Sequence, residues 1–214
     1  MSKRDTILEA ALELFIKQGF EKTPTSAISK TAGVATGTLF HHFKTKEDLI
    51  SALYLDIKLN LQDLLITSIN QEALTSPDNM NGDFIKDTFH KVWFSMISWT
   101  LANPCKFKFL TQFSDSAHIN TETRERVENA FSEWTTLFEK GQALGIFSHM
   151  PSDLLVSLAT NHMFTSCEYL LNNPDLWKSE AFQMDLFHSC WVQLNQHTPS
   201  KLNLTIDKQQ EAKQ

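Results

Sequence analysis

The chain has 214 residues, of which 42% are hydrophobic and 21% charged. This apolar content suffices for a packed core and excludes wholesale disorder, while 6 Gly and 6 Pro are too few for a sandwich or barrel of short strands. The net charge of -6 is unevenly spread: residues 1–50 hold 7 Lys and Arg against 6 Asp and Glu, and residues 51–214 hold 12 against 19. The first fifty residues are therefore comparatively basic.

The cysteines and the first residues of the chain indicate which cellular compartment to expect. Three cysteines, at positions 105, 167 and 190, lie too far apart for a disulfide framework or a CxxC metal motif. We find no apolar signal core and no stretch of 18 uncharged apolar residues, so we expect a cytoplasmic protein without a membrane span. Cys105 lies beside Lys106, which leaves redox sensing open as an alternative to a small buried role.

Two capping boxes frame the first fifty residues. Ser2 and Asp5 precede a helical pattern that ends at Gly19, and Thr45 and Asp48 precede a long amphipathic run. In each pair a hydroxyl can accept from a backbone N–H of the first turn while the carboxylate accepts from the cap residue. Each box therefore predicts the start of a helix.

Two shorter helices are expected between these boxes. The first follows Thr25 and is broken by Ala32-Gly33-Val34, and the second is capped by Thr36 and runs through Phe43. Glycine suits such a turn because it adopts positive φ at little cost. Two helices joined in this way form a helix-turn-helix, whose second helix can enter a DNA major groove.

The remaining chain also follows a helical pattern. We expect a loop over 74–82, helices over about 83–103, 104–113, 120–145, 152–172 and 177–197, and then a polar tail. The prediction is an all-α fold of about nine helices. It has a three-helix DNA-binding domain over 1–47, an effector-binding and dimerisation domain over 48–197, and a flexible tail over 198–214.

Polar side chains and one glycine gather around the turn. The predicted DNA-binding residues are Thr25, Thr36, Gly37, Thr38, Phe40, His41, His42, Lys44 and Lys46. Leu39 and Phe43 share one helix face and can anchor it to the first helix. The alternative is an ordinary polar helix face. Metal binding by the adjacent histidines is disfavoured, since they project about 100° apart on a helix.

The order of residues here carries a family resemblance. The segment Gly33–Leu49, read GVATGTLFHHFKTKEDL, resembles the signature of TetR-family transcriptional regulators, and Ile7–Phe20 is similar to the opening of that family. The resemblance implies a homodimeric repressor that binds a near-palindromic double-stranded operator. It also implies that an effector in the larger domain changes the spacing of the two DNA-binding heads.

Two positions depart from the family pattern. Phe40 stands where the family usually has tyrosine, so a hydroxyl that could donate to a phosphate is missing, although apolar contact with sugar or a thymine methyl remains. Ala35 stands where the family favours Ser or Thr, and Thr36 is expected to take over the cap.

The effector pocket is predicted from aromatic residues, because 12 of the 23 Phe, Trp and Tyr lie in residues 84–147. Bulky rings between helices leave gaps that suit apolar or aromatic ligands, although a filled core is the alternative for each ring. The candidates are Trp93, Ile97, Phe109, Phe113, Trp134, Phe138 and His162. An inward-facing carboxylate such as Asp87, Asp115 or Glu168 would favour a cationic ligand instead.

The dimer interface is predicted on the last two helices, whose apolar residues exceed one narrow stripe. The candidates are Leu155, Leu158, Met163, Ser166, Leu170, Phe182, Leu186, Phe187, Cys190, Trp191 and Leu194. The alternative is that these are core helices of one subunit.

Two other classes of function remain open. One is a helical carrier or enzyme that uses the aromatic interior without DNA, and the other is a DNA-binding protein with a filled interior. We expect no catalytic residue, metal or cofactor, because neither a nucleophile–base pair nor a ligand spacing is evident.

Overall fold

The computed structural model describes residues 2–67 and 81–195. Within these residues lie nine α-helices and one 3-10 helix, and no strand beyond an isolated bridge between Phe147 and Asn195. The helices are α1 (Lys3–Gln18), α2 (Thr25–Thr31), α3 (Thr36–His42), α4 (Lys46–Thr67), α6 (Gly82–Ala102), α7 (Pro104–Phe113), α8 (Thr121–Ala143), α9 (Ser152–Asn172), η2 (Pro174–Lys178) and α10 (Glu180–Leu194). The all-α prediction is confirmed. The predicted tail and nearly all of the predicted loop over 74–82 lie outside the described residues.

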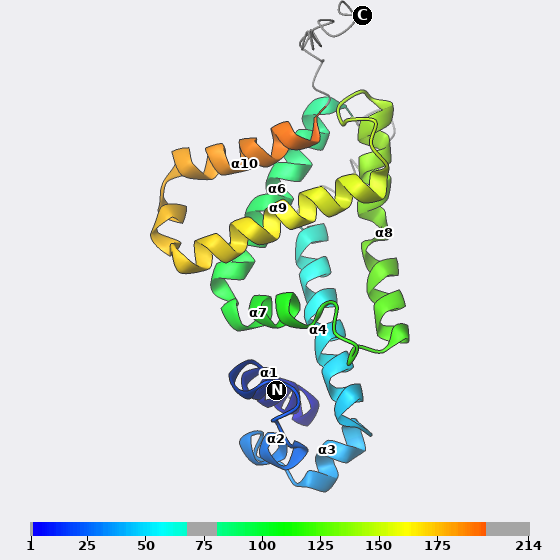
Figure 1. Cartoon of the computed structure of the whole chain (residues 1–214), viewed down its shortest axis with the longest axis vertical. Coiled ribbons are helices and arrows are strands. Elements are labelled where there is room, and N and C mark those ends of the chain that lie inside the picture. The colour runs from blue at the N-terminus through cyan, green and yellow to red at the C-terminus, as the bar shows by residue number, and fades with distance from the viewer. Residues whose placement is uncertain (1, 68–80, 196–214) are drawn as a thin grey trace, which may run out of the picture.

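Helices α1, α2 and α3 form a head at one end of the molecule (Figure 1). Helix α4 begins beside α3 and runs from the head into the larger group of helices, where it packs against α6, α7 and α8. Helix α7 lies against α1, and α9 crosses α6 and α8 before the chain returns as α10. The long α4 therefore connects the head directly to the larger part. None of the described helices is long and apolar enough to cross a membrane.

Both predicted capping boxes are present. The amide of Asp5 donates to Ser2 Oγ at 3.2 Å, and the amide of Ser2 donates to Asp5 Oδ2 at 3.0 Å. Hydrogen bonding from the backbone and the side chain of Ser2 to the Asp5 carboxyl lowers the pKa of that carboxyl. Thr45 and Asp48 make the equivalent pair, at 3.0 Å in each direction. The four hydrogen bonds satisfy amides that a helix start leaves unpaired.

The predicted cap of α3 is wrong by one residue. Ala35 takes the cap position in an extended conformation and offers no side-chain hydrogen bond. Thr36 is the first helical residue, and its Oγ1 lies 3.2 Å from Ser29 Oγ on α2. The Thr36 hydroxyl therefore links the two short helices instead of capping the second.

The last helix begins later than predicted. Residues 174–178 form the 3-10 helix η2 with Pro174 at its start, and α10 begins only after Ser179, whose Oγ accepts from the Phe182 amide at 3.4 Å. A single helix from 177 would have lacked this cap. The helix ends at Leu194, and the predicted end at 197 lies outside the described residues.

Aromatic rings fill the core at the far end from the head. The Phe147 ring is fully buried and contacts the rings of Phe89, Phe138 and Trp191 at centroid distances of 5.2, 5.0 and 5.7 Å. Gly141 of α8 lies directly beneath it, since a Cβ at that position would come within 2.3 Å of the ring. This cluster joins α6, α8 and α10.

Candidate nucleic-acid interface and ligand cavity

A tight turn sets the angle between α2 and α3. The Gly33 amide donates to the Lys30 carbonyl at 3.2 Å, and the Val34 amide donates to the Ser29 carbonyl at 3.0 Å. Gly33 adopts φ of +65°, a conformation that other residues adopt only at a cost. The predicted reason for glycine in this turn is confirmed.

One face of α3 is anchored and the other is exposed. Leu39 and Phe43 are buried at 0% and 4% exposure, as their shared face predicts. Phe40 lies on the outside at 41% exposure. Of the other predicted DNA-binding residues, Thr36, Gly37, His41, His42 and Lys44 are exposed, and Thr25, Thr38 and Lys46 are half-buried. Six of the nine predicted residues are thus exposed and three are half-buried, while contact with DNA stays a prediction.

Gly37 has no structural role within the described chain. A Cβ built there would meet no atom within 4 Å, and its φ is not positive. Glycine in a helix costs up to about 1 kcal/mol relative to alanine. The residue is therefore explained best by something outside the subunit that approaches the backbone closely.

Lys46 does not extend freely from the head. Its Nζ lies 4.2 Å from the centre of the Phe20 ring and donates to the Glu21 carbonyl at 3.4 Å. The same Phe20 ring stacks on the His118 ring at a centroid distance of 4.0 Å, and His118 Nε2 lies 3.4 Å from Glu21 Oε1. Phe20 thus contacts both the start of α4 and the connection between α7 and α8.

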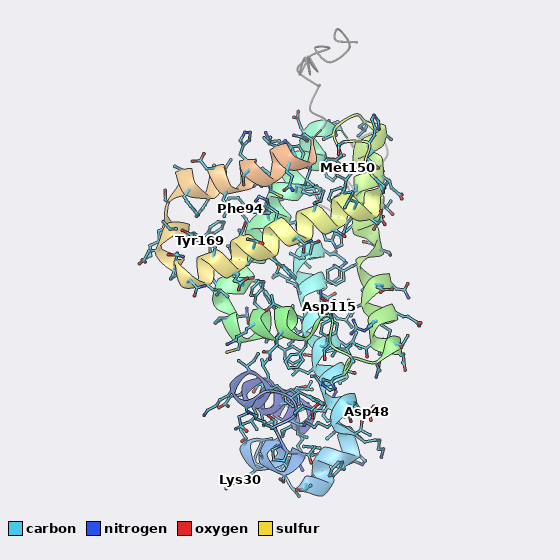
Figure 2. The ribbon with its side chains drawn as sticks, viewed as in Figure 1. Lys30, Asp48, Phe94, Asp115, Met150 and Tyr169 are labelled. Atoms are coloured by element: carbon cyan, nitrogen blue, oxygen red, sulfur yellow. The ribbon has the colours of Figure 1, made fainter. Side chains whose placement is uncertain are left out.

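This connection is the junction between the head and the larger part. Figure 2 shows Lys30 in the head, Asp48 near the start of α4, and Asp115 where the α7–α8 connection meets α4. Arg124 of α8 donates to the carbonyls of Ser114 and Ser116 at 2.6 and 2.5 Å. These hydrogen bonds hold the connection to the first turn of α8.

A cavity of about 280 Å³ lies between α4, α6, α8 and α9. Its lining is mostly apolar, with side chains at helical spacing on each of the four helices. The lining residues are Lys58, Leu61, Leu65, Phe89, Val92, Met96, Val127, Glu128, Phe131, Trp134, Phe138, Val156, Ala159, Thr160, Met163 and Phe164. Such a cavity is of the kind that binds small apolar molecules.

The predicted pocket residues divide into two groups. Trp134 and Phe138 line the cavity. Trp93, Ile97, Phe109 and Phe113 are at most 5% exposed and fill the core elsewhere, since none of them lines it. His162 is also absent from the lining, and its ring nitrogens lie 3.1 Å from Gln193 Oε1 and Ser189 Oγ of α10. These five are corrections to the predicted lining, because helix packing turns them away from the cavity.

Lys58 is the one basic residue of the lining, and sequence reasoning missed it. It lies in α4 on the stripe formed by Tyr54, Leu61 and Leu65, so a cation interrupts an otherwise apolar helix face. Its Nζ lies 5.3 Å from the centre of the Phe131 ring. The available signal in the sequence was that Lys58 lies four residues after the core residue Tyr54 and three residues before the core residue Leu61.

Most of the predicted dimer residues are buried within the subunit. Seven of them, Leu155, Ser166, Leu170, Phe187, Cys190, Trp191 and Leu194, are at most 8% exposed, and Met163 lines the cavity. The core alternative therefore applies to these eight, while Leu158, Phe182 and Leu186 are partly exposed. The large apolar side chains exposed on α9 and α10 are Leu154, Tyr169 and Met184.

The three cysteines are free thiols. Cys167 and Cys190 are buried, and burial raises the pKa of their thiols to about 11 and about 12. Both therefore serve as small core residues, whereas Cys105 is exposed. No group of three or more His, Cys, Asp or Glu that could hold a metal ion occurs among the described residues.

Two family models match the chain. Residues 7–53 match the model described as "Bacterial regulatory proteins, tetR family", and residues 85–207 match "Tetracyclin repressor-like, C-terminal domain". Among curated proteins, the transcriptional regulator QacR of Staphylococcus aureus is 44% identical over 63 residues, and UidR of Escherichia coli is 46% identical over 52. These matches span 29% and 24% of this chain and only 31% and 26% of those relatives.

Solved structures match over nearly the whole chain. A TetR family transcription regulator from Shewanella sp. PV-4 has a TM-score of 0.81 and 31% identity, over 92% of this chain and 100% of that one. A second, from Marinobacter aquaeolei VT8, has a TM-score of 0.76 and 20% identity, over 90% and 95% of the two chains. The second match shows the shared fold alone.

Proposed function

The chain belongs to the TetR family of transcriptional regulators, and from this premise we propose that it is a cytoplasmic homodimeric repressor that binds a near-palindromic operator and leaves it when a small apolar effector binds. The observation that carries the proposal is the exposed end of α3, where Gly37 gives up helix stability at a position with no neighbour among the described residues. A phosphate backbone or base edge supplies such a neighbour.

The outer faces of α9 and α10 are the proposed contact between subunits. Leu154, Tyr169 and Met184 are 43%, 55% and 49% exposed there, and Leu158 is partly exposed. Figure 2 shows Tyr169 near the end of α9 that is farther from α8. Two such helix pairs can bury these side chains against each other around a two-fold axis. The two heads would then contact successive turns of one DNA face.

The effector acts through α8 in this proposal. Val127, Phe131 and Trp134 face the cavity, and Arg124, one turn earlier on the same helix, holds the α7–α8 connection. That connection carries His118, which stacks on Phe20 of the head. A ligand that displaces α8 would therefore move the surface on which the head rests. Release follows if the ligand prefers a head spacing that the operator does not fit.

Salt dependence tests the DNA-binding part of the proposal. Fluorescence anisotropy with a mixed-sequence duplex of about three helical turns would measure affinity between about 50 and 200 mM salt. We expect a loss of roughly hundredfold or more over this range, because phosphate contacts release counterions. An apolar carrier that uses the cavity alone would show no DNA binding at low salt, and that result would reject the proposal.

A further inference from the structure

We propose that the cavity between α4, α6, α8 and α9 binds a monocarboxylate with an apolar body, and that Lys58 Nζ holds the carboxylate. This inference rests on the proposed function, in which the cavity is the effector site, and it names the chemical class of the effector. It follows from the charge inside the cavity, the lack of an anionic partner for that charge among the described residues, and the apolar character of the remaining wall.

Of the two charged residues that line the cavity, the less exposed one is positive. Lys58 and Glu128 are the charged residues of the lining, and they differ in exposure: Lys58 is half-buried, whereas Glu128 is exposed. The carboxylates that could have favoured a cationic ligand are all exposed and lie outside the lining. Asp87 pairs with Lys91 at 2.7 Å, and Asp115 and Glu168 lie on the surface.

The Lys58 ammonium makes neither an ion pair nor a hydrogen bond with any residue that the structure describes. Its contacts are the rings of Phe131 and Tyr54, with Nζ 5.3 and 5.8 Å from the ring centres. Burial lowers the pKa of the ammonium, which reflects the cost of a charge that has lost water without gaining an anion. A carboxylate in the cavity supplies the missing anion and a charge-assisted hydrogen bond.

The rest of the wall suits a hydrocarbon body. The Trp134 indole N–H already donates to Gln62 Oε1 at 3.0 Å, and Gln62 Nε2 donates to the Ala130 carbonyl at 2.7 Å. Thr160 is the one neutral side chain of the lining with a hydroxyl. A cavity of about 150 Å³ accommodates benzene, so this one accommodates a ligand of about a dozen non-hydrogen atoms. Aliphatic and aryl monocarboxylates of that size share the required chemistry.

Decanoate and decanamide form a matched pair of probes, because they have the same size and shape and differ in charge. Isothermal titration of the full chain at neutral pH would give both dissociation constants. We expect decanoate to bind roughly tenfold or more tightly than decanamide, because only the anion pairs with Lys58. Equal affinities, or tighter binding of decylamine than of decanoate, would overturn the inference.

Two lysine variants identify the group that binds the carboxylate. Lys58→Met keeps a long apolar side chain, so the fold should persist, and we expect it to abolish the preference for decanoate over decanamide. Lys91→Met is the matched control on α6, where the lysine is paired on the surface, and it should keep the preference. A preference that survives Lys58→Met would contradict the assignment. 4-Phenylbutyrate and its amide repeat the comparison with an aryl body.

The same samples separate this inference from the proposed function. Binding to the mixed-sequence duplex is measured beside ligand binding. DNA binding without a preference for decanoate would overturn the carboxylate assignment and leave the regulator intact. A Lys58-dependent preference for decanoate without any DNA binding would support the ligand class and reject the proposed function. A decanoate preference together with decanoate-driven loss of DNA binding would support both.

Discussion

At the residue scale, Gly33 and Gly37 are glycines for different reasons. Gly33 has a φ of +65°, so the backbone of the turn itself demands it. Gly37 has no positive φ and open space where a Cβ would stand. The first glycine therefore serves folding, and the second serves a contact that the isolated subunit does not show.

This difference predicts the behaviour of Gly37→Ala. The added methyl group should raise helix stability by up to about 1 kcal/mol, because it removes the flexibility of glycine without a clash. It should also weaken DNA binding roughly tenfold, because it stands on the face that approaches the duplex. Thermal unfolding and fluorescence anisotropy measure the two effects on one preparation.

Gly33→Ala is the control for this pair of effects. It should lower stability by about 1 kcal/mol, because alanine must adopt a left-handed conformation in the turn. If Gly37→Ala bound DNA as tightly as the unsubstituted chain, the close approach of DNA to α3 would be contradicted.

Sequence reasoning succeeds at residues whose environment is local. The boxes of Ser2 with Asp5 and Thr45 with Asp48 involve neighbours three residues apart, so the sequence contains all the information that they need. The hydroxyl of Thr36 was assigned to the wrong partner because Ser29 lies seven residues away, across the turn. The position of the Lys58 ammonium depends on how four helices pack together, and no local sequence pattern determines it.

At the element scale, α8 combines three surfaces along its length. Its start binds the α7–α8 connection through Arg124, its middle faces the cavity, and its end packs Gly141 against Phe147. The Gly141 contact admits no side chain, since a Cβ would lie 2.3 and 2.4 Å from two ring atoms of Phe147. The fully buried ring, in contact with three other aromatic rings, has little room to move.

Gly141→Ala should therefore destabilise the protein by about 1 to 3 kcal/mol, although alanine is the better helix former. Urea unfolding followed by circular dichroism measures this change. Gly37→Ala is the matched substitution at a helical glycine without neighbours, and it should have the opposite sign. A Gly141→Ala variant as stable as the unsubstituted chain would show that the core around Phe147 is loosely packed.

Helix order and most boundaries were predictable at this scale because glycine, proline and capping residues mark them. The division of aromatic residues between core and cavity was not. Trp134 and Phe138 face the cavity, while Trp93 and Phe109, of the same residue types, are buried in the core. Periodicity identifies the inward side of a helix, but the space on that side depends on how the helices cross.

At the scale of the whole molecule, the Phe20 and His118 rings join the head to the larger part. Their stacking at 4.0 Å, with Lys46 Nζ also close to the Phe20 ring, brings three segments together. His118→Ala removes one side of this contact, which is worth about 0.5 to 1.5 kcal/mol for aromatic pairs. We expect amide hydrogen exchange in the head to rise about three- to tenfold, because local opening becomes easier.

Mass spectrometry would locate this exchange along the chain. The exchange of α9 and α10 should stay unchanged, and His188→Ala, at an exposed histidine of α10, should leave the head unaffected. Equal exchange in the head of His118→Ala and of the unsubstituted chain would remove this contact from the proposed path between cavity and DNA.

At this scale, the predicted dimer surface shows what the sequence alone could not determine. The apolar excess on the last two helices was read as a contact between subunits, yet Phe187, Cys190 and Leu194 belong to the core of one subunit. Sequence alone does not separate the two kinds of burial, because both require apolar side chains at helical spacing. Exposed apolar residues such as Tyr169 and Met184 become recognisable only after the fold is known.

Selection of bound DNA from a random-sequence pool tests the central claim most directly. A dimer that presents two copies of α3 should enrich an inverted repeat whose half-sites are centred about one helical turn, or a multiple of it, apart. Gly37→Ala in the same selection should enrich the repeat poorly. No enrichment at low salt by folded protein, or enrichment of a single unrepeated half-site, would contradict the account of a dimeric reader of DNA.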